Sequence, residues 1–599
     1  MPVDTSPLSA DATSLASRPF DATGNSVPCA CPLCTGAATV SEADAATGQS
    51  YLNADQRAGT VVNGKESFTI DRAGLQLTGF DEQTMAPAPG WGGVAGRSFT
   101  VTYAFRSTEP ASMPGDTEGF QRFNAQQIYQ AEQAMQAWAD VANIRFVRVG
   151  IGTAGEGAYS NDAAILFGNY TSGESGSSAF ANFPGSTSST STAGDVWINV
   201  TAGTNSLPSM GNYGAQVLIH EIGHAIGLAH PGDYNAGDGD SPITYASSAE
   251  YYEDSRQYTV MSYFSESNTG GSYGGRYAAA PQLDDIRAAQ IEYGANMSTR
   301  TGDTVYGFNS TAGRDWFAAA NSSSRVIFAV WDAGGRDTFD FSGYSQNQVI
   351  DLREGFFSNV GGLTGNVAVA QGAKIENAIG GFGADTINGN ALDNAIDGGA
   401  GFDSVFSGAG NDTIAGGAGT SYLRGEDGND SIAGGAVFDD IQGNTGNDTE
   451  RGGDGDDFVV GGKDNDVLFG ENGADLVYGN IGSDTCDGGT GDDIVRGGQD
   501  NDSISGGDGA DFMSGDRGSD TVSGGAGADI FHISSDAGSD RVLDFNLAEG
   551  DRVQLDPGAT FSVAQVGEDT VITLASPSDQ MILVGVQMGA LTPGWIFGA

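Results

Sequence analysis

The sequence predicts an α+β domain followed by an all-β, right-handed parallel β-roll. Up to residue 298, segments with helical spacing alternate with short β-rich segments, which is the pattern of a mixed α+β domain. From Gly380 the chain repeats every nine residues, and such a nonapeptide repeat is typical of a parallel β-roll. Glycine supports this division, because the 94 glycines among 599 residues are concentrated in the C-terminal half.

Local periodicity predicts the elements of the first part. A helix ending near Asn143 is expected because apolar residues recur at helical spacing at Ile128, Ala131, Met135 and Trp138. A stretch at 179–183, inside a Ser/Gly/Thr-rich segment, fits either an edge strand or a surface loop. The other expected elements are a helix from Ser67 to Leu77, strands at 98–105, 144–149, 164–168 and 196–200, a helix from Tyr213 or Gly214, and a helix at 283–294 with a glycine stop.

An eleven-residue motif, H-E-x-x-H-x-x-G-x-x-H, begins at His220. On a helix, His220 and His224 project from one face, and Gly227 allows the sharp turn that returns His230 as a third ligand. Three imidazoles leave one position open for water, which is typical of a catalytic zinc site. Glu221 stands beside the first ligand, where its carboxylate can take a proton from that water without binding the metal.

A second motif, Y-T-V-M-S-Y, follows at residues 258–263. The long histidine motif and a later methionine turn define the metzincin group of zinc peptidases, so a zincin-like catalytic fold is implied. The stretches H-P-G-D-Y, from His230, and V-M-S-Y resemble the serralysins, which are secreted bacterial metalloendopeptidases. This resemblance covers residues 65–599. It implies that Met261 forms the apolar floor beneath the zinc and that Tyr263 can bind the metal and swing to stabilise the oxyanion.

These motifs predict zinc-assisted hydrolysis of peptide bonds in proteins. Zinc on the three histidines would lower the pKa of a water molecule toward ~7, Glu221 would move its proton, and Tyr263 would share the oxyanion charge. One alternative is a non-enzymatic, calcium-dependent surface or adhesion protein, but the intact zinc-site residues argue against it. A lipase of the same repeat class is disfavoured, because no G-x-S-x-G nucleophile elbow is evident at a strand-to-helix junction.

The connecting segment, residues 299–379, is expected to bind the first calcium ions. The stretches T-G-D-T-V-Y-G, from Thr301, and W-D-A-G-G-R-D, from Trp331, match the serralysin pattern. The resemblance implies backbone oxygens and carboxylates as ligands, with Glu376 serving an adjacent ion. The implied set is Arg300, Gly302 and Thr304 through backbone oxygens, Asp332 and Asp337 through carboxylates, and Gly334 and Gly335 in the same turn.

Counted in nines from Gly380 to His532, the chain holds 17 repeats of the form G-G-x-G-x-D-x-U-x. Ser407 replaces the first Gly in one repeat, and Asn394 and Ser421 replace the Asp in two others. Six residues should form a calcium-binding turn, and the last three a short strand with its apolar residue inward. Calcium would lie between turns two repeats apart. The ligands expected in the first turns are Gly381, Gly383, Asp385, Gly399, Gly401, Asp403, Gly408, Gly410 and Asp412.

The formal net charge of −52 argues against nucleic acid as a partner, because a phosphate backbone would be repelled. It suits a protein whose carboxylates hold several calcium ions and whose repeats stay expanded until cations neutralise them. No Sec-type signal peptide and no run of 18 apolar residues is present, so no membrane insertion is expected. We expect a monomer that leaves a bacterial cell by type I export, folds in extracellular calcium and acts on proteins or peptides.

Residues 1–60 are interpreted as a mobile leader, a propeptide of a zymogen. Within it, Cys29, Cys31 and Cys34 could place a thiolate on the open zinc position, could have a separate metal or redox role, or could be incidental. His532 is expected to pack rather than to bind metal. The end of the chain, G-W-I-F-G-A, is apolar but lacks the acidic residue expected beside an export signal. The expected domains are the leader 1–60, the catalytic domain 61–298, the connecting segment 299–379, the roll 380–532, and the cap with its secretion signal 533–599.

Overall fold

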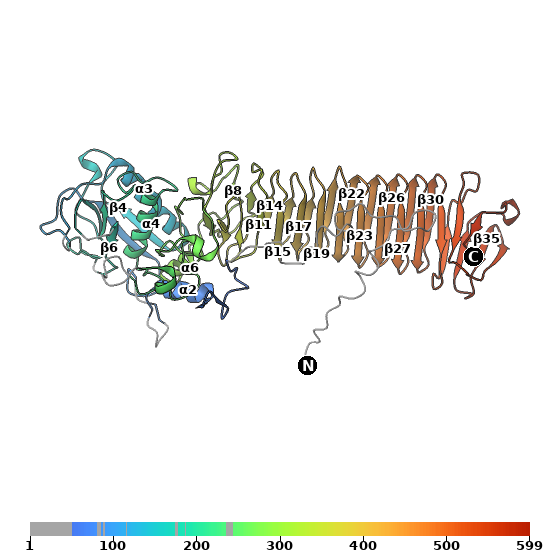
Figure 1. Cartoon of the computed structure of the whole chain (residues 1–599), viewed down its shortest axis with the longest axis horizontal. Coiled ribbons are helices and arrows are strands. Elements are labelled where there is room, and N and C mark those ends of the chain that lie inside the picture. Colours follow the sequence, from blue (N-terminus) through green and yellow to red (C-terminus); the bar gives the residue numbers. More distant parts are fainter. Residues whose placement is uncertain are drawn as a thin grey trace. The chain divides into compact units, whose positions relative to one another are not determined.

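A computed structural model (Figure 1) describes residues 51–80, 86–87, 90–114, 117–173, 178–185, 187–234 and 243–598. The chain divides into two compact units. The first unit is Ser50–Thr445, and the second contains Gly446–Ala599. Cys29, Cys31 and Cys34 lie outside the described residues, so the three hypotheses about them stay predictions.

In the first unit, five of the described strands form one sheet in the order β4-β3-β5-β7-β6. Strands β4, β3, β5 and β7 are parallel, whereas β6 runs antiparallel to β7 at the edge. The stretch at 179–183 therefore contains an edge strand rather than only a loop. The strands are β3 (Phe99–Phe105), β4 (Ile144–Arg148), β5 (Ile165–Tyr170), β6 (Ala179–Ala181) and β7 (Val196–Asn199).

Two long helices pack against each other and against this sheet. The helix predicted from apolar spacing is α3 (Ala125–Val141), and its four spaced residues are buried. Helix α4 (Tyr213–Ala225) carries the histidine motif, and Asn212 caps it by accepting a hydrogen bond from the backbone N–H of Ala215 (3.0 Å). The remaining helical segments are α2 (Ile70–Leu77), α5 (Tyr245–Ser248), α6 (Leu283–Tyr293, stopped at Gly294), η1 (Glu156–Ala158) and η2 (Glu266–Thr269).

Residues 51–60 belong to the folded unit and not to a mobile leader. Arg57 is only 5% exposed, and its guanidinium donates two hydrogen bonds to the Asp284 carboxylate, at 2.9 and 3.0 Å. The Nε of Arg57 also donates to the carbonyl of Phe68 (2.7 Å). The prediction of a leader reaching residue 60 is thus wrong for its last ten residues. A buried ion pair between positions 227 residues apart holds them, and no local pattern predicts it.

The connecting segment shares one buried apolar core with the α+β part. One cluster of buried apolar residues extends from Tyr51, through helices α3, α4 and α6, to Ile441 in the repeats. The core is therefore continuous across the expected boundaries at 298 and 379. The strands of this segment are β8 (Val305–Gly307), β9 (Phe328–Val330), β10 (Thr338–Asp340), β11 (Val349–Asp351), β12 (Phe357–Ser358), β13 (Val367–Val369) and β14 (Asn377–Ile379), with η3 (Asp315–Phe317); β1 (Val61–Val62) and β2 (Lys65–Glu66) pair near the start.

Within the first unit, repeat strands pair in parallel with the strand two repeats on. Ile387, for example, stands opposite Val405, so two nonapeptides make one coil as predicted. One sheet has the order β11-β15-β17-β19-β21, and the other includes β8-β10-β14-β16-β18-β20. The repeat strands are β15 (Thr386–Asn390), β16 (Ala395–Asp397), β17 (Asp403–Gly408), β18 (Thr413–Ala415), β19 (Ser421–Asp427), β20 (Ser431–Gly435) and β21 (Asp440–Thr445).

The second unit follows the same rule, and each of the strands β22 to β30 is 6 residues long. The predicted three-residue strand is too short here, because the first residues of the next turn stay extended, as in β26. Its cap ends in the antiparallel strands β34, β35 and β36. The strands are β22 (Thr449–Asp454), β23 (Phe458–Lys463), β24 (Val467–Asn472), β25 (Leu476–Ile481), β26 (Thr485–Thr490), β27 (Ile494–Gln499), β28 (Ser503–Asp508), β29 (Phe512–Arg517), β30 (Thr521–Ala526), β31 (Ile530–Ile533), β32 (Ser539–Val542), β33 (Arg552–Leu555), β34 (Ser562–Val566), β35 (Asp569–Thr573), β36 (Gln580–Leu583) and β37 (Ile596–Phe597), with η4 (Met588–Ala590).

The eighth residues of the repeats form a buried column inside the second unit. Val459, Leu468 and Val477 are fully buried. Cys486, whose thiol forms no disulfide, is the buried eighth residue of the following repeat. His532 lies beside the ring of Phe512, with ring centroids 5.6 Å apart, in keeping with a packing role.

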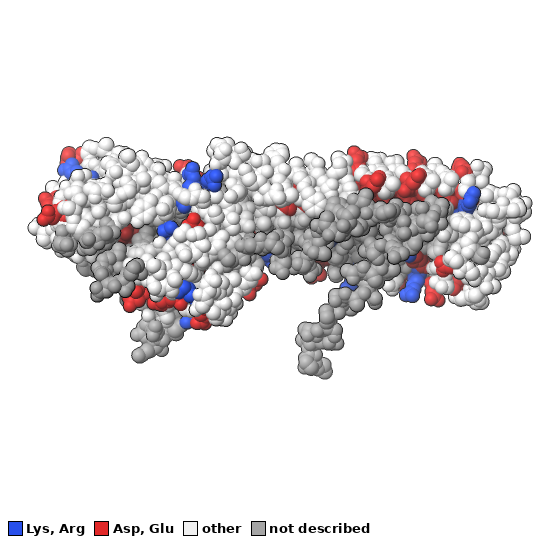
Figure 2. All heavy atoms as spheres, viewed as in Figure 1, with Lys and Arg blue, Asp and Glu red and all other residues white. Residues whose placement is uncertain are grey.

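Figure 2 shows acidic side chains gathered along the edge near β22, β26 and β30.

The predicted fold class, an α+β domain followed by a parallel β-roll, is confirmed. No helix in the described ranges combines the length and the apolar character needed to cross a membrane.

Candidate metal centres

Helix α4 and the turn after it bring three histidines to one point. The Nε2 atom of His224 lies 3.1 Å from Nε2 of His220 and 3.1 Å from Nε2 of His230, and the third pair is 3.3 Å apart. His220 and His224 are one helical turn apart and are each 8% exposed. Gly227 has a φ of +114°, which lets the chain leave the helix sharply enough for His230 to return.

The other ring nitrogen of each histidine, Nδ1, is hydrogen-bonded to a backbone carbonyl oxygen. A carbonyl only accepts, so each Nδ1 carries the hydrogen, and the three Nε2 lone pairs face one another. Burial also lowers the pKa of His220 to about 4 and the pKa of His224 well below its usual value, which keeps both rings neutral. Three neutral nitrogen donors that converge in this way fit a zinc ion. The accepting carbonyls are those of Val260 (2.9 Å), Leu228 (2.6 Å) and Tyr234 (2.8 Å).

Met261 is fully buried against the helix turn that carries the first two histidines. A Cβ atom placed on Gly223 would lie 2.4 Å from the sulfur of Met261 and 3.2 Å from the ring of Trp138. Position 223 must therefore be glycine if the sulfur is to keep its place against α4. This placement supports the predicted apolar floor.

Glu221 is the acidic side chain next to the first histidine on α4. It is 6% exposed, and its Oε2 atom has no hydrogen-bond donor within the described part of the chain. Burial raises the pKa of Glu221 to about 8. A carboxylate with a raised pKa and a free oxygen is suited to taking up a proton and releasing it again near neutral pH.

Tyr263 and Tyr234 both lie beside His230. The ring centroid of Tyr263 lies 4.5 Å from that of His230 and 5.8 Å from that of His220. The ring of Tyr234 stacks on His230 at 5.3 Å with an interplanar angle of 13°. The structure thus brings Tyr263 to the histidine cluster, as the resemblance implied.

The edge strand β6 leads directly to the histidine cluster. Phe183, two residues beyond β6, lies with its ring centroid 5.7 Å from that of His224 and is 53% exposed. The strand also packs against α4. An extended peptide that paired with β6 on the side opposite β7 would lie near His224.

Two buried acids near the cluster were not predicted from the sequence. Asp285, at the start of α6, accepts hydrogen bonds from Thr259 and Val260. Asp254 accepts hydrogen bonds from Tyr234 and from Ser262. For Asp285 the helix start gave a signal, since an acid at the third helical position often closes a capping box. For Asp254 no local pattern exists.

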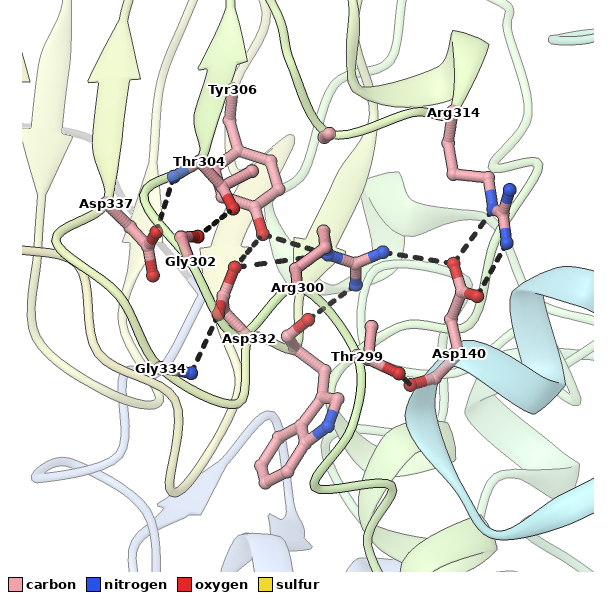
Figure 3. A network of polar contacts seen from close by, with 12 residues as sticks. Asp140, Thr299, Arg300, Gly302, Thr304, Tyr306, Arg314, Asp332, Gly334 and Asp337 are labelled. Atoms are coloured by element: carbon pink, nitrogen blue, oxygen red, sulfur yellow. Dashed lines mark hydrogen bonds and ion pairs between the residues drawn. The ribbon is translucent and has the colours of Figure 1, made fainter.

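The two predicted calcium-binding stretches of the connecting segment meet, as Figure 3 shows. A Cβ on Gly335 would lie 2.6 Å from the carbonyl oxygen of Gly302. The Oδ1 atom of Asp337 accepts a hydrogen bond from the backbone N–H of Thr304 (2.8 Å), but its buried Oδ2 has no donor among the residues described. Burial, together with the charge of Asp332, raises the pKa of Asp337 to about 7. A buried anion with an unused oxygen fits a calcium ligand.

Three more of the predicted ligands, Arg300, Asp332 and Glu376, lie close to Asp337 or to the turn that precedes it. Asp332 accepts hydrogen bonds from Tyr306 (2.6 Å) and from the backbone of Gly334 (2.9 Å), and Glu376 accepts one from the backbone of Asp337 (2.8 Å). The guanidinium of Arg300 points to Asp140 and to the carbonyl of Trp331 (Figure 3), so only its backbone oxygen can serve an ion.

In the first repeats, turns two repeats apart stack backbone on backbone. A Cβ on Gly399 would lie 2.4 Å from the carbonyl oxygen of Gly381, and one on Gly401 would lie 2.2 Å from that of Gly383. Gly408 and Gly410 have positive φ angles of 104° and 127°, which favour glycine there as well.

The aspartates of these turns are not equivalent. Asp403 and Asp412 each use Oδ1 to accept one backbone N–H, while the buried Oδ2 lacks a donor among described residues. Asp385, in contrast, has donors on both oxygens, namely the backbone N–H groups of Gln348 (2.7 Å) and Gly381 (2.6 Å). The unused oxygens of Asp403 and Asp412 fit calcium better than the carboxylate of Asp385 does.

Comparison with known families agrees with this geometry. Residues 105–271 match a model described as metallo-peptidase family M12. Residues 295–421 match the model of the peptidase M10 serralysin C terminal. Five segments, 406–441, 424–449, 451–486, 487–522 and 505–542, match the RTX calcium-binding nonapeptide repeat.

Similar proteins come from several bacteria. Serralysin C of Dickeya chrysanthemi is 49% identical over 334 residues, which cover 55% of this chain and 66% of that protein. Metallopeptidase AprA of Pseudomonas marginalis is 45% identical over 370 residues, covering 60% and 74%. Serralysin of Proteus mirabilis is 45% identical over 336 residues, covering 55% and 66%. The matches to the two serralysins thus span just under two thirds of their length.

Proposed function

The chain belongs to the serralysin family, and from this premise we propose that it is a secreted, zinc-dependent endopeptidase with a calcium-dependent β-roll. One observation carries the proposal: three Nε2 atoms converge within 3.3 Å, with Glu221 beside them on the same helix. A surface protein without catalytic activity would have no need of this arrangement. That alternative is not favoured.

The reaction proposed is hydrolysis of a peptide bond in a protein substrate. Zinc held by His220, His224 and His230 would supply a Lewis acid that lowers the pKa of water and polarises the scissile carbonyl. Glu221 takes the proton of the attacking water on its free oxygen and passes it to the leaving amine nitrogen. Tyr263, beside His230, donates a hydrogen bond to the oxygen that becomes negatively charged.

Positioning of the substrate is assigned to the edge strand. A substrate in extended conformation pairs with β6, whose other edge is occupied by β7. Phe183, whose ring lies beside His224, would then be next to the bound substrate. This pairing holds the scissile carbonyl against the histidine cluster while leaving the substrate side chains exposed, so cleavage should be tolerant of sequence.

Calcium is proposed for the connecting segment and the repeat turns. The buried carboxylate oxygens of Asp337, Asp403 and Asp412 that lack donors among the described residues would each contact an ion. The chain would stay expanded where calcium is scarce and fold outside the cell, which suits type I export. The export apparatus and protein substrates are the proposed partners, and the proposed location is extracellular.

The decisive experiment replaces Glu221 with Gln in the full chain. We expect Glu221→Gln to retain one zinc per chain and to cleave casein about 10²- to 10⁴-fold more slowly, because the proton acceptor is lost. Glu292→Gln is the matched control, since Glu292 is a buried acid that holds the backbone N–H of Gly90 (2.9 Å), and the amide keeps an acceptor there. Undiminished cleavage by Glu221→Gln, or no zinc and no cleavage in the wild type, would overturn the proposal.

A further inference from the structure

The segment 259–262, which passes beneath the zinc centre, is held by two buried carboxylates that do not touch the histidines. One is Asp285, and the other is Asp254, and both are fully buried. The catalytic mechanism uses neither of them. Their contacts show which parts of the centre each one controls.

Asp285 controls the carbonyl that orients His220. The Val260 carbonyl accepts the Nδ1–H of His220 (2.9 Å), and the Val260 N–H donates to Oδ2 of Asp285 (2.7 Å). The Oδ1 atom of Asp285 accepts the hydroxyl of Thr259 (2.6 Å). Because Oδ2 also accepts the backbone N–H of Gln282 (2.8 Å) at the start of α6, the carboxylate is itself fixed by a helix. Both oxygens of Asp285 are therefore in use.

Asp254 joins the loop after His230 to the turn that carries Tyr263. Its Oδ1 atom accepts the hydroxyl of Tyr234 (2.8 Å) and the hydroxyl of Ser262 (2.6 Å). The carbonyl of Tyr234 in turn accepts the Nδ1–H of His230 (2.8 Å), and its ring stacks on that imidazole. Oδ2 of Asp254 is buried and has no donor in the described ranges. Only one oxygen of Asp254 is thus in use.

We propose that Asp285 and Asp254 are positioning residues of the zinc centre, acting on His220 through Val260 and on His230 and Tyr263 through Tyr234 and Ser262. The inference rests on the proposed zinc-dependent function. A shift of either backbone carbonyl would turn an imidazole away from the point where the three Nε2 atoms meet. Partners beyond the ligands affect metal affinity by about 10- to 100-fold, even without contact to the metal.

Asp285 accepts hydrogen bonds on both carboxylate oxygens and Asp254 on one, so substitution by Asn should affect the two positions differently. An Asn side chain has one acceptor oxygen and one NH₂ donor. In Asp285→Asn, either the N–H groups of Val260 and Gln282 face the NH₂, or the NH₂ donates to the Thr259 hydroxyl, which then loses the acceptor for its own hydrogen. In Asp254→Asn the single oxygen can keep both of its donors, and the NH₂ group takes the place of the unused oxygen. Removing the donors themselves, in Tyr234→Phe with Ser262→Ala, breaks both contacts of Asp254.

The test compares these variants in the full chain with calcium. We expect Asp285→Asn and the Tyr234→Phe/Ser262→Ala double variant to release zinc to a chelator about 10- to 100-fold faster than the wild type. They should also change the visible spectrum of the cobalt-substituted protein and lower kcat more than they raise KM. Asp254→Asn should resemble the wild type in all three. Thr259→Val, which removes one donor to Asp285, should show a smaller shift of the same kind if Asp285→Asn fails to fold.

The outcomes separate this inference from the proposed function. If the wild type holds no zinc, the function fails first. If the wild type binds zinc and cuts protein, but the folded Asp285→Asn and double variants match its zinc release rate and cobalt spectrum, the inference is overturned. It is overturned as well if these variants lower only the thermal midpoint, because a purely structural role would do that. An Asp254→Asn protein as impaired as Asp285→Asn would contradict the assigned use of one oxygen.

Discussion

Buried carboxylates differ between the α+β part of the molecule and the roll. Near the zinc centre, both oxygens of Asp285 accept hydrogen bonds, and Asp284 is paired with Arg57. In the second unit, each repeat aspartate uses one oxygen to accept the backbone N–H of the aspartate two repeats before it, as Asp475 does from Asp457 (2.8 Å). The other oxygen is buried and has no donor among the described residues in a series from Asp466 to Asp529: Asp466, Asp475, Asp484, Asp493, Asp502, Asp511, Asp520 and Asp529.

Asp284 and Asp285 thus find their partners within the protein, whereas the repeat aspartates each keep a buried oxygen that an outside cation could contact. A buried carboxylate with donors on both oxygens stabilises its surroundings without help. A column of buried carboxylates, each with an unused oxygen, is costly until positive charge arrives. The α+β part should therefore fold by its own contacts, whereas the roll should depend on calcium.

Removal of calcium should have the largest effect. We expect the amides of β23 to β30 to lose hydrogen-exchange protection by about 10²-fold or more in a chelator that binds calcium, because the unpaired carboxylates then repel and stay desolvated. The amides of β3, β5 and β7 in the same sample serve as the comparison and should lose far less. Equal loss in both sets would show that the two regions depend on calcium alike.

The pH dependence of the calcium-free roll should be the next largest effect. Burial raises the pKa of Asp466 and of Asp502 from 3.8 to about 8, so between those pH values the folded roll binds more protons than the unfolded chain. Its free energy of unfolding must then fall as the pH rises from about 4 to 8. We expect circular dichroism in a chelator to show more folded roll at pH 5 than at pH 8. With calcium the order should reverse, since the ion needs ionised carboxylates.

A single amide substitution should have opposite consequences in the two regions. Asp475→Asn keeps the oxygen that accepts from Asp457 and removes a buried charge, so the calcium-free roll should become slightly more stable. With calcium, the same change should raise the calcium concentration needed for folding by roughly tenfold, because one charged ligand is lost. Asp285→Asn should destabilise the chain in both conditions. Calcium titrations followed by circular dichroism and urea unfolding would check these signs.

The smallest effect should come from restoring an aspartate. Ser421 stands where the repeat has Asp, and its backbone N–H donates to Oδ1 of Asp439 (2.6 Å) as an aspartate at this place would do. Its hydroxyl offers no negative charge to an ion shared with Asp403 or Asp439. We expect Ser421→Asp to increase the number of calcium ions bound per chain by isothermal titration and to raise the thermal midpoint in calcium by a few degrees. Unchanged stoichiometry would show that this turn binds calcium already.

Much of the architecture could be read from local patterns. Helices α3, α4 and α6 and strands β3 to β7 lie close to their predicted positions, because their signals are apolar spacing, caps and β-rich runs. The pairing of strands two repeats apart also follows directly from the nonapeptide period. The expected strand length was too short, since the sequence pattern does not say how far the backbone stays extended into the next turn.

The amino-acid sequence by itself determined the zinc motif, the period of the roll and the concentration of negative charge, because each depends on residues near one another in the chain. Only the tertiary structure decided that residues 51–60 are anchored through Arg57 and that Asp254 and Asp285 surround the turn beneath the zinc centre. These contacts join distant positions in a buried environment, where a carboxylate must find its donors wherever the fold places them. The geometry of burial, rather than local spacing, selects those partners.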